Sequence, residues 1–191
     1  MKTLVKMILS ISALVILSGC SFNNNSVHKP GSVIHRDIFQ ESSVTNIPAS
    51  KASVQIEFSV KNNKARIVET YIKHSDPAYT VTVNIDGQLT EITNEPVLED
   101  LPGDFKKNPE VGTGWKYNFK KDLLLEPGKH HITIAVPLSD VIVEKDITLS
   151  AGTNKLKVIP IYNASAVRNQ EHPRFNHGLN KVELFLNNQK M

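Results

Sequence analysis

Apolar and polar residues alternate strictly in the stretch that begins at Ser53. One face of this stretch is entirely apolar, and it consists of Val54, Ile56, Phe58 and Val60. Because successive side chains of a β-strand point to opposite faces, this period of two predicts a strand with one buried side. A turn signal at 61–64 and a second apolar run at 65–73 follow, and together they predict a hairpin.

The same period recurs in short segments along the rest of the chain. The segments expected to be strands are 79–85, 89–92, 115–119, 123–125, 130–136, 141–149, 155–162 and 181–186. Turn residues separate several of them, namely Asp86-Gly87, Glu126-Pro127-Gly128-Lys129 and the stretch 150–154. No long amphipathic helix is expected before residue 163. The segment 181–186, which is expected to be a strand, also suits a short helix. The pattern predicts a mainly β fold, an antiparallel immunoglobulin-like or transthyretin-like sandwich of about 7–8 strands.

Residues 93–114 interrupt this rhythm and are expected to form a long loop. The segment contains several prolines and glycines and a group of acidic residues, Glu95, Glu99, Asp100, Asp104 and Glu110. These acids lack the Asp-x-Asp-x-Asp-Gly spacing of a calcium loop, so they indicate a solvated segment. Long loops in compact domains are often functional. This one supplies the first candidate contact residues, which are Pro102, Phe105, Lys106 and Lys107.

The first twenty residues follow a different pattern, with a cationic start, an apolar run and small residues before a cysteine. Lys2 and Lys6 precede the uncharged stretch 7–17, which is too short to span a membrane but suits the core of a signal peptide. The sequence Leu17-Ser18-Gly19-Cys20 resembles the lipobox of bacterial lipoproteins. The resemblance implies cleavage before Cys20, a diacylglyceryl group on its thiol, and an acyl chain such as palmitate on the new amino terminus.

The lipobox sets the expectation for location, because two or more acyl chains give stable membrane anchoring. Cys20 is followed by Ser21 rather than by the aspartate that would suggest inner-membrane retention in a Gram-negative host. We therefore expect a lipid-anchored cell-envelope protein, in the outer membrane and facing the periplasm or the surface if the host is Gram-negative. Cys20 is the only cysteine, so a lipidated mature chain has no disulfide and depends on a packed core.

Domain boundaries follow from these patterns. We expect a signal peptide at 1–19 that is removed, a lipidated cysteine and flexible tether at 20–50, a sandwich domain at 51–163, and a C-terminal loop with a candidate last strand at 164–191. Ile38 and Phe39 are apolar and could dock part of the tether onto the domain. Loss of Lys2 and Lys6 leaves 20 of the 22 basic residues against 19 acidic ones. This near-neutral balance gives no electrostatic reason to expect a nucleic-acid partner.

Part of the strand region is similar to a known domain type. The similar segments are Val83-Asn84-Ile85-Asp86-Gly87, the stretch Leu125 to Ile134 around Pro127-Gly128, Ile147-Thr148-Leu149 and Gly152, and they resemble a PEGA-type domain. The resemblance spans residues 79–159 and implies a small β-sandwich in a bacterial surface or envelope protein, with no catalytic residues to transfer. The chain departs from the family pattern at 88–124, which replaces a short link, and it lacks the Pro-Glu-Gly-Ala run.

Histidines are the main candidates for metal binding. His130 and His131 are adjacent on an expected strand, so they point to opposite faces and cannot bind one metal; one half-buried and one exposed histidine are expected. His172 and His177 flank a loop segment, but two histidines fall short of the ligands that zinc requires. We expect no metal, no other cofactor and no enzyme, because the chain lacks Gly-x-Ser-x-Gly, a phosphate-binding glycine loop and His-Glu-x-x-His.

Trp115, Tyr117 and Phe119 share one face of an expected strand. A place in the core accounts for them, because aromatic side chains bury large areas. The alternative is an exposed stacking platform for glycan, flanked by neighbouring lysines. We favour the core, since an exposed row of aromatic rings would form an apolar patch on the surface.

The leading functional interpretation is a non-enzymatic envelope module that binds another protein as an assembly or accessory factor. Sandwiches commonly bind partners through end loops or exposed edges, so the expected contact segments are 94–114 and 172–178. The further candidate contact residues are Trp115, His172, Phe175 and His177. The first alternative is a module that binds peptidoglycan or surface polysaccharide through Trp115. A weaker alternative is a small metal-dependent hydrolase that uses His172, His177 and a carboxylate.

Overall fold

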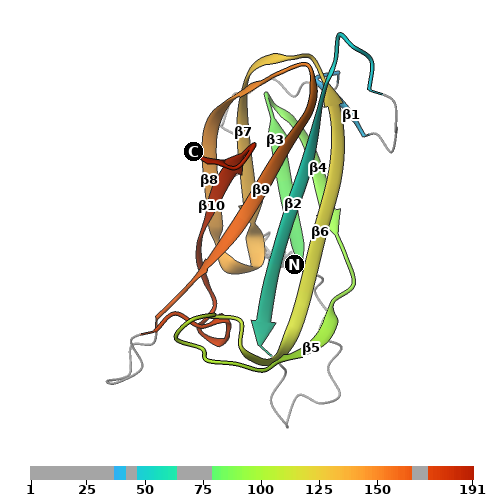
Figure 1. Cartoon of the computed structure of the whole chain (residues 1–191). Coiled ribbons are helices and arrows are strands. Elements are labelled where there is room, and N and C mark those ends of the chain that lie inside the picture. The colour runs from blue at the N-terminus through green and yellow to red at the C-terminus, as the bar shows by residue number, and fades with distance from the viewer. Residues whose placement is uncertain (1–36, 42–46, 64–78, 165–171) are drawn as a thin grey trace, which may run out of the picture.

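The computed structural model describes residues 37–41, 47–63, 79–164 and 172–191. These residues form two β-sheets that pack against each other around one core, with no α-helix among them (Figure 1). The strands are β1 Phe39–Glu41, β2 Ala52–Asn63, β3 Thr80–Ile85, β4 Gln88–Thr93, β5 Val97–Leu101, β6 Gly112–Leu125, β7 Gly128–Val136, β8 Val141–Leu149, β9 Gly152–Tyr162, β10 Leu179–Leu186 and β11 Gln189–Lys190. Two short 3-10 helices are η3 Pro137–Ser139 and η4 Phe175–His177. In this part of the chain, no helix is long and apolar enough to cross a membrane.

The two sheets differ in size and in strand direction. The larger has seven strands in the order β1-β6-β2-β9-β10-β11, with β5 paired to the edge of β6 that β1 also uses. The smaller has four strands in the order β4-β3-β7-β8, all antiparallel. β2 and β9 run parallel, and their pairing ends at Phe58 and Val158. Residue 160 is a proline, which has no N–H with which to extend this ladder, so β9 leaves β2 at that point.

Inward-facing residues of both sheets form a single core. The larger sheet contributes Val54, Ile56, Phe58, Tyr117 and Phe119, and the smaller sheet contributes Val81, Val83, Ile132 and Ile134. Full burial of each large apolar side chain stabilises the fold by about 1.5–3 kcal/mol before the entropy cost of folding is subtracted. The period of two in the sequence is therefore the pattern of core residues, which confirms the mainly β prediction.

Several finer predictions are wrong. The turn expected at 61–64 is absent over residues 61–63, because β2 continues to Asn63, opposite Gly114 of β6. The loop expected at 93–114 contains β5, since its prolines bracket that strand without interrupting it. The described chain has eleven strands instead of seven to eight, and the β2–β9 pair is not antiparallel. The expected hairpin strand 65–73 lies outside the described residues.

Two segments expected outside the sandwich domain belong to its larger sheet. The candidate last strand is confirmed as β10, which pairs with β9. In the expected tether, Phe39 of β1 is buried. The backbone N–H of Phe39 donates to the side-chain amide oxygen of Gln88, in the smaller sheet, at 3.0 Å. Glu41 pairs with Lys121 at 2.6 Å and accepts from Thr90 at 2.6 Å, and these two hydrogen bonds hold the pKa of Glu41 below its ordinary value. β1 therefore links the two sheets.

Candidate functional site

Two segments far apart in the sequence meet at one end of the sandwich. They are residues 102–111, which connect β5 to β6, and residues 172–178, which contain η4 (Figure 1). The backbone N–H of Phe175 donates to the carbonyl of Pro109 at 3.0 Å, which joins the two segments directly. We call the surface that they form the loop end. It unites much of the two stretches that the sequence predicted as contact segments.

The outer surface of the loop end places an aromatic ring among basic side chains. Phe105 is 36% exposed. The Arg174 guanidinium lies 4.7 Å from the centre of the Phe105 ring, and the His172 ring stands edge-on to it with a centroid distance of 6.2 Å. Lys106 and Lys107 follow Phe105 and are exposed. A cation over an aromatic face at an exposed site is worth about 0.5–1 kcal/mol, so Arg174 helps to hold the ring in place.

A tight turn presents Phe105 at the tip of its segment. The carboxylate of Asp104 accepts from the backbone N–H of Lys106 at 2.9 Å. The carbonyl of Asp104 accepts from the N–H groups of Lys107 at 3.0 Å and Asn108 at 3.1 Å. An Asp side chain that caps its own turn in this way stabilises the local conformation. The backbone around Phe105 is therefore ordered by local hydrogen bonds.

Lys61 of β2 attaches the loop end to the larger sheet. It belongs to the outward-facing positions of β2, yet its side chain is 0% exposed because the loop end covers it. Its ammonium donates to Glu99 Oε2 at 2.9 Å, to the Glu110 carbonyl at 2.9 Å and to the Gly112 carbonyl at 2.6 Å. It also lies 5.1 Å from the centre of the Phe175 ring. All three ammonium protons are thus used, which satisfies a charge that is costly to bury alone.

Tyr162 and Glu110 extend this network. The Tyr162 hydroxyl accepts from the Lys61 backbone N–H at 2.8 Å and donates to Glu110 Oε1 at 2.6 Å. The Tyr162 hydroxyl thus provides a hydrogen-bond acceptor for the backbone of β2 beyond the point where the pairing of β2 with β9 ends. Burial, followed by the charge and hydrogen bond of Glu110, raises the pKa of the Tyr162 phenol above its ordinary value. Glu110 also forms an ion pair with Lys116. The segment 102–111 is therefore fixed by buried polar contacts.

The structure brings together most of the predicted contact residues. Those exposed on the loop end are Pro102, Phe105, Lys106, Lys107 and His172, and His177 is half-buried beside them. Phe175 is only 3% exposed, so it packs beneath the surface, and its prediction as a direct contact residue is wrong. Its ring is buried because it covers the stem of Lys61 and lies against Gly114.

The aromatic row of β6 lies in the core, as the sequence favoured. Tyr117 and Phe119 are each 1% exposed, and their ring centroids are 5.8 Å apart. Burial raises the pKa of Tyr117 to about 12. Trp115 lies at the end of the row, half-buried against the same core and outside the two contact segments. The row therefore does not offer a platform of three exposed rings.

The two adjacent histidines differ in side-chain exposure, but both residues are partly buried, so the expected exposed histidine is not found. The His130 side chain is 10% exposed and lies 2.6 Å from Asp86, whereas His131 is 43% exposed. His172 contacts an aromatic ring, and the Nδ1 atom of His177 lies 3.3 Å from a backbone carbonyl. Within the described ranges, no group of three or more His, Cys, Asp or Glu side chains has a metal-binding arrangement.

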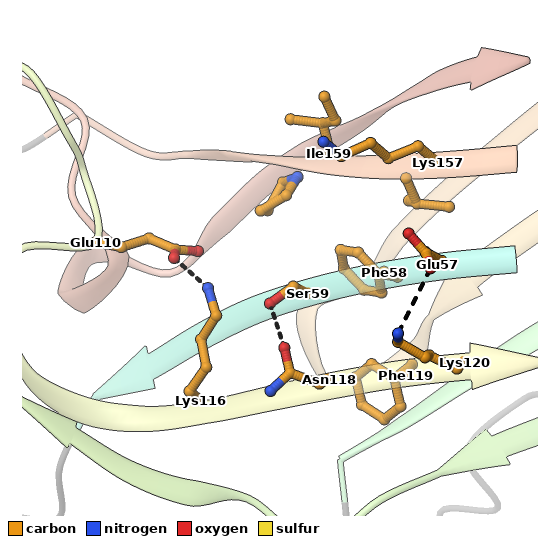
Figure 2. Close-up of a pocket in the computed structure, with 12 residues that line it drawn as sticks. Glu57, Phe58, Ser59, Glu110, Lys116, Asn118, Phe119, Lys120, Lys157 and Ile159 are labelled. Atoms are coloured by element: carbon orange, nitrogen blue, oxygen red, sulfur yellow. Dashed lines mark hydrogen bonds and ion pairs between the residues drawn. The ribbon is translucent and has the colours of Figure 1, made fainter. Parts of the chain in front are cut away.

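A groove lies beside the loop end on the outer face of the larger sheet (Figure 2). Its volume is about 340 Å³, and β2, β6, β9 and Glu110 line it. Three polar pairs follow one another along it, namely Glu110 with Lys116, Ser59 with Asn118, and Glu57 with Lys120. Strand alternation directs the neighbouring Phe58 and Phe119 into the core and charged or polar side chains toward the groove, although more of the exposed lining is apolar than polar.

The sequence did not identify Lys61, Glu110 or Tyr162 as important residues. A lysine at an outward strand position and a glutamate in an acidic loop are ordinary features of a solvated surface. One available signal was Pro160, because a proline inside an expected strand indicates an edge or a break in pairing. Lys61 is covered by segments that lie about fifty and more than a hundred residues away in the sequence. The residues next to Lys61 in the sequence therefore give no indication that it is buried.

Comparisons with known proteins returned nothing: no protein-family model, no curated protein and no solved structure matches this chain. Three features of the described residues bear on function. They are the exposed aromatic and basic surface of the loop end, the buried polar network that fixes it, and the groove beside it.

Proposed function

We propose that this chain is a non-enzymatic, lipid-anchored envelope protein that binds a protein partner through its loop end, as an assembly or accessory factor. The lipobox at Cys20 supports the anchor, and it lies outside the described residues. The two-sheet fold supports an immunoglobulin-like or transthyretin-like binding module, and the resemblance to PEGA-type domains supports an envelope role. Ser21 after the cysteine favours the outer membrane of a Gram-negative host, with the domain facing the periplasm or the surface.

The observation that carries this proposal is the fixed presentation of Phe105 beside Arg174. Binding energy at protein interfaces is concentrated in a few residues, and aromatic and arginine side chains are enriched among them. Phe105 stands in the turn that Asp104 stabilises, and the backbone N–H of Arg174 donates to the Asn163 carbonyl at 3.1 Å. A surface that is ordered before binding loses less conformational entropy when the partner arrives.

The side chains exposed on the loop end indicate which kind of surface the partner presents. Arg174 lies over the partly exposed Phe105 ring, Lys106 and Lys107 are exposed next to it in the sequence, and the carboxylate of Asp104 is engaged in its own turn. The complementary surface has an apolar pocket for Phe105 and carboxylates around its rim. Charged rim groups of this kind accelerate association and set specificity more than they add to affinity.

The test is co-purification of the full-length, lipidated protein from gently cross-linked membranes. The test variant combines Phe105→Ala with Arg174→Ala, and the matched control combines Leu138→Ala with Lys145→Ala, which removes an exposed apolar and a basic side chain elsewhere. We expect a stoichiometric protein partner with the wild type and the control, and its loss with the test variant. Equal recovery with both variants would reject the loop end as the binding surface.

The anchor has its own test, because the domain could bind a partner whether or not it is lipidated. Mass spectrometry of the mature amino terminus should find an acylated Cys20, and Cys20→Ala should leave an unprocessed precursor. An unmodified mature terminus after another residue would reject the lipoprotein assignment and leave the binding proposal standing.

A further inference from the structure

The groove on the larger sheet exists because two neighbouring strands separate. β2 and β9 are parallel partners up to Phe58 and Val158, and Pro160 has no N–H with which to continue the ladder. Beyond this point Tyr162 contacts the backbone of β2 through its hydroxyl. The opening that results is bounded by the strands on its sides and by Glu110 at the loop end (Figure 2).

The groove is lined by a row of hydrogen-bonding groups with an apolar side. Ser59 donates its hydroxyl proton to Asn118 Oδ1 at 2.8 Å, and this orientation leaves the amide N–H groups of Asn118 as donors for water or a ligand. The pair of Glu110 and Lys116 is mostly buried, with side-chain exposures of 17% and 15%. β9 supplies Ile159 and Pro160 to the lining.

The charges of the groove decide which ligand class it suits. Three lysines and two glutamates line it, and Lys116 and Lys120 are paired with Glu110 and Glu57. Because these pairs neutralise most of the positive charge, the groove is poorly suited to phosphate or another small dianion. Alternating donors and acceptors match a molecule that carries many hydroxyl groups, and an apolar wall matches the C–H face of a sugar ring.

We propose that this groove binds a neutral saccharide unit, with Ser59 and Asn118 at its centre and the Glu110–Lys116 pair where it borders the loop end. The site is separate from the surface proposed for the protein partner and does not require that proposal. It also differs from a platform built on Trp115, since Trp115 packs against the core and does not line the groove.

The test uses the full-length protein in detergent and four neutral tetrasaccharides as probes, made of glucose in either linkage, of N-acetylglucosamine and of galactose. Inorganic phosphate serves as the anionic probe. Titration calorimetry gives the affinity, and hydrogen–deuterium exchange locates the site. The test variant is Ser59→Ala with Asn118→Ala, and the matched control is Thr148→Ala on an exposed position of β8. Phe105→Ala with Arg174→Ala separates this site from the loop end.

We expect at least one tetrasaccharide to bind and to slow exchange in residues 57–60 and 116–120. Loss of the two central hydrogen-bonding groups should weaken its binding roughly tenfold, while Thr148→Ala and the Phe105–Arg174 variant bind as the wild type does. The proposal is overturned if none of the four sugars binds, if phosphate alone binds, if protection appears elsewhere, or if the test variant binds as tightly as the control.

Discussion

The two ends of the sandwich are closed by different means. At one end, which we call the turn end, Asp86 and Gly87 have φ angles of 49° and 93° and form the left-handed pair of a two-residue hairpin turn. His130 ties this turn to the next one, because its ring nitrogens lie 2.6 Å from the Asp86 carboxylate and 2.9 Å from the Glu126 carbonyl. The loop end instead is built from long segments that a buried lysine holds down.

The difference shows where a small sandwich can carry a binding surface. Short turns satisfy their own backbone and leave little area for a partner. Long segments expose more surface, but they need distant contacts to become ordered, as when Lys61 binds Glu110 and Tyr162. Binding residues commonly stand on loops that a rigid scaffold positions. If the loop end is such a surface, loss of its anchoring contacts should disturb it and leave the turn end unaffected.

The largest effect is expected from Lys61→Met. The substitution keeps the apolar stem but leaves Glu99 and two backbone carbonyls without their donor, and removal of one partner of a buried charge pair costs about 3–5 kcal/mol. Urea unfolding should show a loss near the lower limit, because Glu99 is 36% exposed and can reach water. Amide exchange should increase in 102–111 and not at the turn end.

Lys120→Met is the matched control for that change. Lys120 is 75% exposed and faces Glu57 at 3.5 Å, so its loss should change the free energy of unfolding by less than about 0.5 kcal/mol. Equal stability of the two variants would show that the buried network does not hold the loop end.

Gly114→Ala should be the next most damaging change. A Cβ atom at this position would lie 2.6 Å from the Asn62 carbonyl oxygen and 2.6 Å from the Phe175 ring, closer than real contacts allow. Overpacking of this kind costs typically about 1–3 kcal/mol. Thermal unfolding measures the loss, and exchange should rise in 172–178 as η4 is displaced. The neighbouring variant Thr113→Ala, at an exposed position, should unfold nearly as the wild type does.

Tyr162→Phe should cost about 1–2 kcal/mol at neutral pH, because it leaves the Lys61 N–H without its acceptor and Glu110 Oε1 without the hydroxyl donor, while Glu110 keeps its ion pair with Lys116. Burial and Glu110 raise the pKa of Tyr162 above its ordinary value near 10.0, so the unfolded chain loses this proton first as the pH rises. The stabilisation is therefore complete below about pH 10 and declines above it. Urea titrations from neutral to alkaline pH should give a shallower decline in the Phe variant, and an identical slope would contradict this role.

His130→Ala should cost about 1 kcal/mol, since it removes the link between two turns that are also fixed locally. Its exchange effects should be confined to the turn end. Combined with Lys61→Met, the two losses should add within about 0.5 kcal/mol in a double-mutant cycle, because the residues lie at opposite ends. A larger coupling would mean that the two ends are not independent.

Phe105→Ala should have the smallest effect on stability, within about 0.5 kcal/mol, because the ring is partly exposed and its turn is held by backbone bonds. Its expected effect is on partner recovery alone. A loss of stability as large as that of Gly114→Ala would instead make Phe105 a structural residue of the loop end.

The sequence alone was sufficient for the features that depend on neighbouring residues. The period of two identified β3, β7, β8 and β9 closely, since alternation is a local consequence of strand geometry. Asp86-Gly87 predicted its turn because few dipeptides tolerate two positive φ angles. The core position of Tyr117 and Phe119 followed from the same alternation.

Only the tertiary structure determined which distant segments of the chain lie next to each other. No local pattern shows that β2 pairs in parallel with β9, that Lys61 is covered although it stands on the outer face, or that 102–111 and 172–178 share one surface. Strand formation needs only backbone geometry and burial of one face. Pairing order and the burial of a charge instead depend on contacts between residues far apart in the chain, and their free energies appear only when the sheets have assembled.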